Sequence, residues 1–252
     1  MAVIPYQALT NLTLGLVAAA GAIGLQQQQL DRLDRPADYQ LEAETAATRL
    51  AVTKQSPTFG FSALAADWVL LEYLQYFGDD EARGATGYAL AGDYLDRVTE
   101  LDPRFFLPYI FISPGVSYYQ GQPERSIELF ERGIEHLSPE LHPNAFAAAR
   151  FKALDHFLLL GDVPGAIDAF EVAIDWLAGT PFADYRSGLE QTVEFLATSA
   201  DSVRARYIGW ADVYANASDP LVRDRAAEEL RALGAREVRG EDGSVRFAPP
   251  EF

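Results

Sequence analysis

The chain has 252 residues, a formal net charge of −17 and no cysteine. This length is enough for one large domain or a solenoid with a hydrophobic core, and 49 % hydrophobic residues exclude a disordered chain. The absence of cysteine excludes disulfides, thiolate metal sites and cysteine nucleophiles. Because 37 acidic residues outnumber 20 basic ones, the surface repels phosphate backbones, and nucleic acid is not an expected partner.

Residues 1–30 contain no Asp, Glu, Lys or Arg, and the stretch from Val3 to Leu25 is largely apolar. At a helical rise of about 1.5 Å per residue, a helix over residues 3–25 is long enough to cross the roughly 30 Å core of a bilayer. We therefore predict one membrane-spanning anchor helix. Two alternatives are a cleaved signal peptide and a buried helix of a soluble protein.

Small residues inside this segment predict close packing against another helix. Gly15 and Ala19 are four residues apart, and Gly24 has a similar small neighbour one turn before it. Arg32 and Arg35 follow the segment, whereas no basic side chain precedes it. The positive-inside rule therefore predicts a single-pass membrane protein with the bulk of the chain on the cytoplasmic side.

In the remainder of the chain, the spacing of apolar residues predicts helices separated by short breaks. Residues 31–58 predict a polar connector with one helix, bracketed by Pro36 and Pro57. Residues 59–233 predict a helical domain. Its helices are expected over residues 62–77, 91–101, 105–119, 124–137, 144–160, 164–177, 185–197, 203–214 and 220–233.

The helix over residues 62–77 begins at Ser62, a residue type that caps helices. Its large apolar residues recur at a helical spacing, which predicts that they form one buried face. These residues are Leu64, Trp68, Leu71, Leu74 and Phe77.

The C-terminal segment, residues 234–252, differs from the rest of the chain. Its residues alternate around Asp242-Gly243, a dipeptide that favours hairpin turns. We predict a small β-hairpin and a tail.

Two windows of the helical part, residues 121–134 and 161–174, share one pattern. Each has a turn glycine, a small residue, a phenylalanine and a second small residue at the same spacing. These positions are Gly121, Ser126, Phe130 and Gly133 in the first window, and Gly161, Ala166, Phe170 and Ala173 in the second. Glycine permits the turn between antiparallel helices, the small residues suit close helix crossings, and phenylalanine fills the space between helix pairs.

This pattern resembles the second helix of tetratricopeptide repeats. The two windows are 40 residues apart, from 121 to 161, whereas that family usually repeats every 34 or so residues. The resemblance implies an all-α fold of helical-hairpin repeats forming an α-solenoid, here with an N-terminal transmembrane helix and a small C-terminal β-hairpin.

A narrower resemblance is carried by residues 61–68, 75–79 and 101–105. These segments resemble uncharacterised bacterial proteins of a cyanobacterial type, in which a membrane helix precedes such repeats. The resemblance implies a scaffold or assembly factor for a photosynthetic or respiratory membrane complex, and it implies no known reaction.

Motifs for catalysis and cofactor binding are not found in the sequence. His136, His142 and His156 do not have the spacing of metal ligands, and there is no glycine-rich phosphate-binding loop. We therefore expect neither an enzyme nor a cofactor or metal site. The alternative is an accessory domain of an enzyme, which requires titrating groups that converge in one pocket.

Twelve aromatic residues fall between residues 68 and 119. Tyrosine is favoured at partner surfaces, so some of these are expected on a concave binding face. The expected partner-binding residues are Asp67, Tyr73, Tyr76, Tyr109, Tyr118 and Tyr119. The sequence therefore predicts a membrane-anchored adaptor for a protein partner. A soluble repeat protein with a packed N-terminal helix is the alternative.

Overall fold

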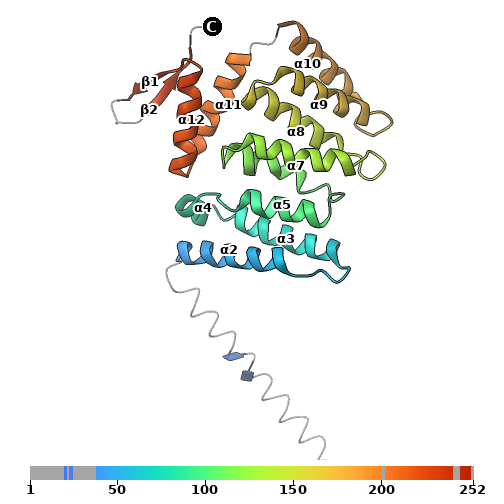
Figure 1. Cartoon of the computed structure of the whole chain (residues 1–252), viewed down its shortest axis with the longest axis vertical. Coiled ribbons are helices and arrows are strands. Elements are labelled where there is room, and N and C mark those ends of the chain that lie inside the picture. Colours follow the sequence, from blue (N-terminus) through green and yellow to red (C-terminus); the bar gives the residue numbers. More distant parts are fainter. Residues whose placement is uncertain (1–19, 22, 25–37, 200–201, 241–244, 251–252) are drawn as a thin grey trace, which may run out of the picture. The chain divides into compact units, whose positions relative to one another are not determined.

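The computed structural model describes residues 20–21, 23–24, 38–199, 202–240 and 245–250 (Figure 1). The chain divides into two compact units, residues 1–42 and residues 43–252. In the first unit, residues 20–21 and 23–24 are helical, and Tyr39 begins a helix that continues into the second unit. All of the sites discussed below lie in the second unit.

The predicted fold class is wrong in its N-terminal part. Among the described residues, no helix is both long enough and apolar enough to cross a membrane. The apolar helix α3 has only 16 residues, about 24 Å at 1.5 Å per residue, and it carries Asp67 and Glu72. The corrected fold class for the described part is a mostly helical protein with a small two-stranded sheet.

Most of the predicted anchor, including Gly15 and Ala19, lies outside the described residues. Gly24 is described, and a Cβ added there meets no atom within 4 Å. The close helix packing predicted at Gly24 therefore stays a prediction.

The elements of the described chain follow one another with short breaks. They are α2 (Tyr39–Gln55), α3 (Ser62–Phe77), α4 (Asp80–Thr86), α5 (Ala91–Leu101), α6 (Tyr109–Ile112), η1 (Ser113–Tyr118), α7 (Pro123–His136), α8 (Phe146–Asp155), η2 (His156–Leu160), α9 (Val163–Trp176), η3 (Ala183–Tyr185), α10 (Arg186–Ser199), α11 (Ser202–Asn216), α12 (Pro220–Ala232), β1 (Arg236–Arg239) and β2 (Val245–Ala248). Of these, η1 and η2 are π-helical turns and η3 is a 3₁₀ turn.

Helices of the second unit pack mainly on their neighbours in the chain. Helix α3 packs on α5, α5 on α7, α7 on α8 and α8 on α9, which gives the stack of helices in Figure 1. A first core is centred on Tyr73, Leu95 and Phe130, and a second on Phe170. A third core, around Trp210, joins α11 and α12 to the turn η2.

The two sequence windows coincide with α7 and α9 and the turns that precede them. Gly121 and Gly161 have positive φ angles of 61° and 69°, which glycine adopts without strain. The small residues and phenylalanines of the windows are buried: Ser126, Phe130, Gly133, Ala166, Phe170 and Ala173. A Cβ added to Gly133 would collide with the ring of Tyr109, so α7 and α6 approach each other closely there.

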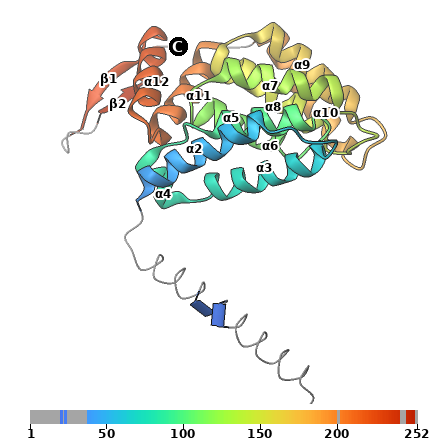
Figure 2. The ribbon, with the colours of Figure 1, turned by 60° about the horizontal axis from the view of Figure 1, so that its bottom comes forward.

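The C-terminal strands pair antiparallel, with Arg236 opposite Ala248 and Arg239 opposite Val245. The predicted turn at Asp242-Gly243 lies outside the described residues. The hydroxyl of Tyr207 on α11 donates a 2.8 Å hydrogen bond to the Phe247 carbonyl, and Figures 1 and 2 show the hairpin beside α12. The hairpin is therefore attached to the last helix pair.

The close approach at Gly133 gives a stability prediction. Gly133→Ala gains helix propensity but places a methyl group against Tyr109, and overpacking of this kind costs about 1–3 kcal/mol. Gly188→Ala is the matched control, because Gly188 is also helical and its added Cβ meets nothing within 4 Å. Urea denaturation followed by circular dichroism should show a lower free energy of unfolding for Gly133→Ala and no decrease for Gly188→Ala. Equal stability of the two variants would contradict the packing.

Candidate functional site

Three of the predicted partner-binding tyrosines lie in the core. Tyr73 and Tyr109 are 0 % exposed and Tyr76 is 8 % exposed. The Tyr109 hydroxyl donates a 2.9 Å hydrogen bond to the Pro103 carbonyl, and the Tyr73 ring stacks on Phe77. Burial raises the pKa of Tyr73, Tyr76 and Tyr109. These residues stabilise the fold and are not part of a partner surface, so the prediction is wrong for them.

The other three predicted residues lie at the surface in two separate places. Asp67 is exposed on α3. Tyr118 and Tyr119 are half-buried at the end of η1, and both line a pocket there. The Tyr119 ring stacks on Tyr88, with centroids 4.1 Å apart. The structure therefore brings Tyr118 and Tyr119 together and leaves Asp67 in a different site.

Helix α3 exposes a row of large apolar side chains. Phe61, Leu64, Trp68 and Leu71 are 67 %, 66 %, 62 % and 60 % exposed. The spacing of Leu64, Trp68 and Leu71 places these three on one side of the helix, and Phe61 is the residue immediately before its first turn. We call these four residues the α3 surface. The predicted buried face is therefore wrong at Leu64, Trp68 and Leu71.

The side of α3 that faces the core is different. It is formed by Ala66, Val69, Tyr73 and Tyr76, all of which are buried. Because α3 is apolar on both sides, hydrophobic spacing alone does not indicate which side is buried.

A shallow groove of about 470 Å³ follows the α3 surface. It runs between α3 and the end of α2 with the loop after it. Its lining consists of Thr53, Pro57, Thr58, Phe61, Leu64, Ala65, Asp67, Trp68 and Leu71. One acidic residue and no basic residue contribute to this lining.

A hydrogen-bonded network is buried where η1, α7 and α8 meet. The Ser113 hydroxyl donates a 2.6 Å hydrogen bond to Asp155, and the Ser117 hydroxyl donates to the other carboxylate oxygen. The oxygens of Ser117 and Ser126 are 2.7 Å apart. Because Ser117 has one proton, which it gives to Asp155, Ser126 donates to Ser117. We call these four residues the Ser–Asp network.

Asp155 is 1 % exposed. Burial raises its pKa from 3.8 to about 7, although the hydrogen bonds from Ser113 and Ser117 act in the opposite direction. The carboxyl group therefore titrates near neutral pH.

Two π-helical turns flank the Ser–Asp network. Ser113 and Ser117 belong to η1, and Asp155 immediately precedes η2. The wide turn of η1 is closed by a 3.0 Å hydrogen bond from the Tyr119 amide to the Pro114 carbonyl. Single π-helical turns inside α-helical segments are frequent at functional sites.

A pocket of about 360 Å³ opens beside this network, and we call it the Tyr118 pocket. Its lining comes from η1, α8 and α11 and consists of Ser113, Pro114, Tyr118, Tyr119, Phe151, Leu154, Asp212 and Asn216. The Asn216 side-chain amide donates a 3.0 Å hydrogen bond to the Asp212 carboxylate. Burial, with Asp155 and Asp212 nearby, raises the pKa of Tyr118 to about 12. The pocket is lined by aromatic residues and has a negatively charged residue, Asp212, in its lining.

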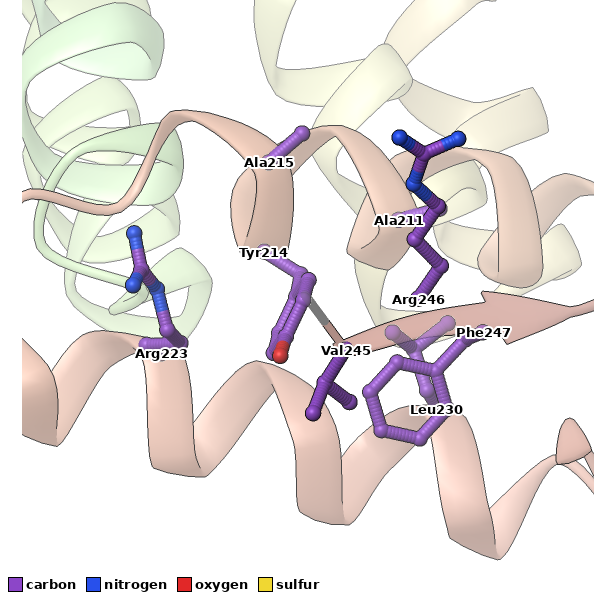
Figure 3. Close-up of a pocket in the computed structure, with 8 residues that line it drawn as sticks. All are labelled: Ala211, Tyr214, Ala215, Arg223, Leu230, Val245, Arg246 and Phe247. Atoms are coloured by element: carbon purple, nitrogen blue, oxygen red, sulfur yellow. The ribbon is translucent and has the colours of Figure 1, made fainter. Parts of the chain in front are cut away.

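A further pocket of about 640 Å³ lies between α11, α12 and β2 (Figure 3). Tyr214 and Phe247 form part of its wall, with ring centroids 5.1 Å apart. Arg223 and Arg246 supply positive charge, but Figure 3 shows that their guanidinium groups do not converge. Arg223 already donates a 2.8 Å hydrogen bond to the Ala217 carbonyl, so it stabilises the turn before α12.

The three histidines are in separate environments. His136 is exposed, with Nδ1 2.8 Å from the Arg132 carbonyl, and His142 stacks on Phe106. His156 is half-buried, and burial lowers its pKa. Within the described ranges, no group of three His, Asp or Glu side chains has the geometry to hold a metal ion.

Comparison with known proteins does not assign a family. No protein-family model matches the chain, and no curated protein matches it.

The raised pKa of Asp155 gives a pH-dependent stability. In the unfolded chain this carboxyl has its ordinary pKa of 3.8, whereas in the folded chain its pKa is about 7. Between these values the folded state binds more protons, so stability falls as pH rises. From pH 5 to pH 8, the free energy of unfolding of the wild type should fall by about 1–3 kcal/mol relative to that of Asp155→Asn, as measured by urea denaturation.

Two further variants make this test specific. Asp168→Asn changes an exposed carboxylate on α9 and should keep the pH dependence of wild type. Ser113→Ala removes a hydrogen bond that lowers the Asp155 pKa. The fall in the free energy of unfolding should therefore occur at higher pH in this variant. The same pH dependence in wild type and Asp155→Asn would refute the role of Asp155.

Proposed function

We propose that this protein is a scaffold that binds a partner protein at the α3 surface. The partner segment is an amphipathic helix that has one apolar face and carries at least one Lys or Arg. One observation carries the proposal: Leu64, Trp68 and Leu71 are exposed on one side of α3, and Phe61 is exposed immediately before its first turn. Contiguous exposed apolar surface of this kind is typical of interaction sites, whereas isolated exposed apolar residues are ordinary.

Charge supports a basic partner. Asp67 lines the groove, and α3 contains Asp67 and Glu72 but no Lys or Arg. The whole chain has a formal net charge of −17, which attracts a basic segment and disfavours an acidic one. A partner helix that lays an apolar face into the groove can therefore place a cation beside Asp67.

Trp68 is the expected anchor of this interface. Tryptophan is enriched among the few residues that carry most binding energy. It lies between Leu64 and Leu71 on the α3 surface, so a partner can surround it with apolar contacts. The opposite side of α3 is fixed in the core by Val69 and Tyr73. The backbone that carries Trp68 is therefore held in position.

The helical stack suits a scaffold of the tetratricopeptide type. Buried small residues at Ala166 and Ala173, and turn glycines with positive φ, support this part of the proposal. Successive helix pairs in such proteins present a rigid surface on which partner segments dock.

Substitution at Trp68 tests the interface. Trp68→Ser should weaken partner binding about 30-fold, which corresponds to about 2 kcal/mol for an interface anchor. Thermal melting should be unchanged, because this side chain is 62 % exposed. Ile208→Ser is the control, since Ile208 is 56 % exposed on α11 and lies outside the groove.

The partner is identified by a photo-crosslinking amino acid placed at position 68, with position 208 as control, in cells of the source organism. The expected result is a crosslink, specific to position 68, to a partner peptide with apolar residues and a Lys or Arg. Asp67→Asn should reduce its yield. Identical products from both positions, or a crosslink only to this chain itself, would refute the proposal.

A further inference from the structure

The Tyr118 pocket has the features of a site for a small cationic group, separate from the α3 surface. Its lining includes the aromatic residues Tyr118, Tyr119 and Phe151 and the apolar residues Pro114 and Leu154. Aromatic ring faces attract cations through their quadrupole, and apolar walls reduce competition from water. A volume of about 360 Å³ suits an amino-acid side chain or a small metabolite.

The polar groups of the pocket are mostly hydrogen-bond acceptors. Asp212 contributes a carboxylate, Ser113 a hydroxyl oxygen and Asn216 a side-chain amide. The Asn216 amide nitrogen donates to the Asp212 main-chain and side-chain oxygens, which orients this exposed carboxylate. No Lys, Arg or His contributes to the lining, and Asp212 makes no ion pair with any described residue.

A second carboxyl group lies behind the pocket wall. Ser113, which lines the pocket, donates to the buried Asp155. Asp155 and Asp212 both raise the pKa of Tyr118, which shows that the Tyr118 hydroxyl is in the negative field of both. A cation in the pocket is therefore attracted by the Asp212 carboxylate and, above about pH 7 where Asp155 is ionised, also by Asp155 behind the wall, whereas an anion is repelled.

We propose that the Tyr118 pocket binds an organic cation, namely a guanidinium or alkylammonium group on a short apolar stem. The head interacts with Asp212 and the ring faces, and the stem lies against Phe151 and Leu154. Two sources supply this chemistry: a free small amine or guanidine, or an Arg or Lys side chain of a peptide.

Binding is tested by calorimetry on the full chain with butylguanidinium as probe. Its uncharged analogue n-butylurea has a similar shape and similar hydrogen-bond donors. The charged probe should bind at least tenfold more tightly. Asp212→Asn should weaken binding of butylguanidinium at least fivefold and leave the weak binding of n-butylurea unchanged.

Two further variants separate the pocket from the general negative charge of the chain. Asp224→Asn removes one negative charge on the exposed side of α12, outside the pocket lining, and should leave binding as in wild type. Phe151→Leu keeps the pocket apolar but removes a ring, and should weaken binding. Circular dichroism establishes that each variant keeps its helical content.

The source of the cation is distinguished by a peptide, acetyl-Gly-Arg-Gly-amide, with the citrulline peptide as its neutral control. Tighter binding of the arginine peptide than of butylguanidinium identifies a peptide side chain. Equal or weaker binding identifies a free small cation.

Three outcomes would overturn the proposal. They are no measurable binding of butylguanidinium or the arginine peptide, equal binding of charged and neutral probes, and equal losses in Asp212→Asn and Asp224→Asn. None of these depends on the α3 surface, so the result is independent of the partner interaction proposed there.

Discussion

The buried carboxyl of Asp155 fixes the relative positions of three successive parts of the helix stack. It lies at the end of α8, and its oxygens accept hydrogen bonds from two serines of η1. Ser126 extends the network to α7. An isolated buried carboxylate is costly, and here its hydrogen-bond partners are hydroxyl groups and not a cation. The arrangement therefore depends on Ser113 and Ser117, because loss of either hydroxyl leaves one buried carboxylate oxygen without its donor.

The position of α11 follows from the same region. The π-helical turn η2 begins directly after Asp155, and its Leu159 carbonyl accepts a 2.9 Å hydrogen bond from the Trp210 indole. A Cβ added to Gly209 would lie 2.5 Å from the Leu158 carbonyl oxygen, so glycine lets α11 approach this turn. That approach brings Asp212 to the Tyr118 pocket. A carboxylate and two tyrosines that are about 90 residues apart in sequence are thereby placed around one cavity.

Helix positions were predictable from sequence wherever glycine, proline or a polar pair interrupts an apolar pattern. The helix expected over residues 62–77 is observed with the same bounds, and α7 and α9 differ from expectation by one residue at each end. Helix α4 was not predicted. It has only seven residues, and Asp79 caps it by accepting a hydrogen bond from the Ala82 amide. The π-helical turns lie inside segments that were expected as continuous helices, residues 105–119 and 144–160, and so they were not predicted either.

The sites were harder to predict than the fold. Tyrosine suits both a core and a partner surface, so composition did not separate buried Tyr73 and Tyr109 from half-buried Tyr118 and Tyr119. The exposed row on α3 was detectable in the sequence, because α3 is apolar on both sides. A helix that packs on the core with one side leaves the other side exposed. Asp155 had no signal, because an Asp residue in a helix is ordinarily solvent-exposed. Only the structure shows which serines surround it.

The stacking of helices on their chain neighbours has a consequence for how the molecule folds. Most helix–helix contacts of the described part join segments close in sequence, so the loop-closure entropy lost in forming them is small. Such a chain acquires native structure in local steps, and one region can open while the next stays folded. The Trp210–Leu159 hydrogen bond is an exception, because it joins residues 51 positions apart. Docking of α11 therefore costs more loop-closure entropy than packing between neighbouring helices, and the Tyr118 pocket needs this docking because Asp212 and Asn216 belong to α11.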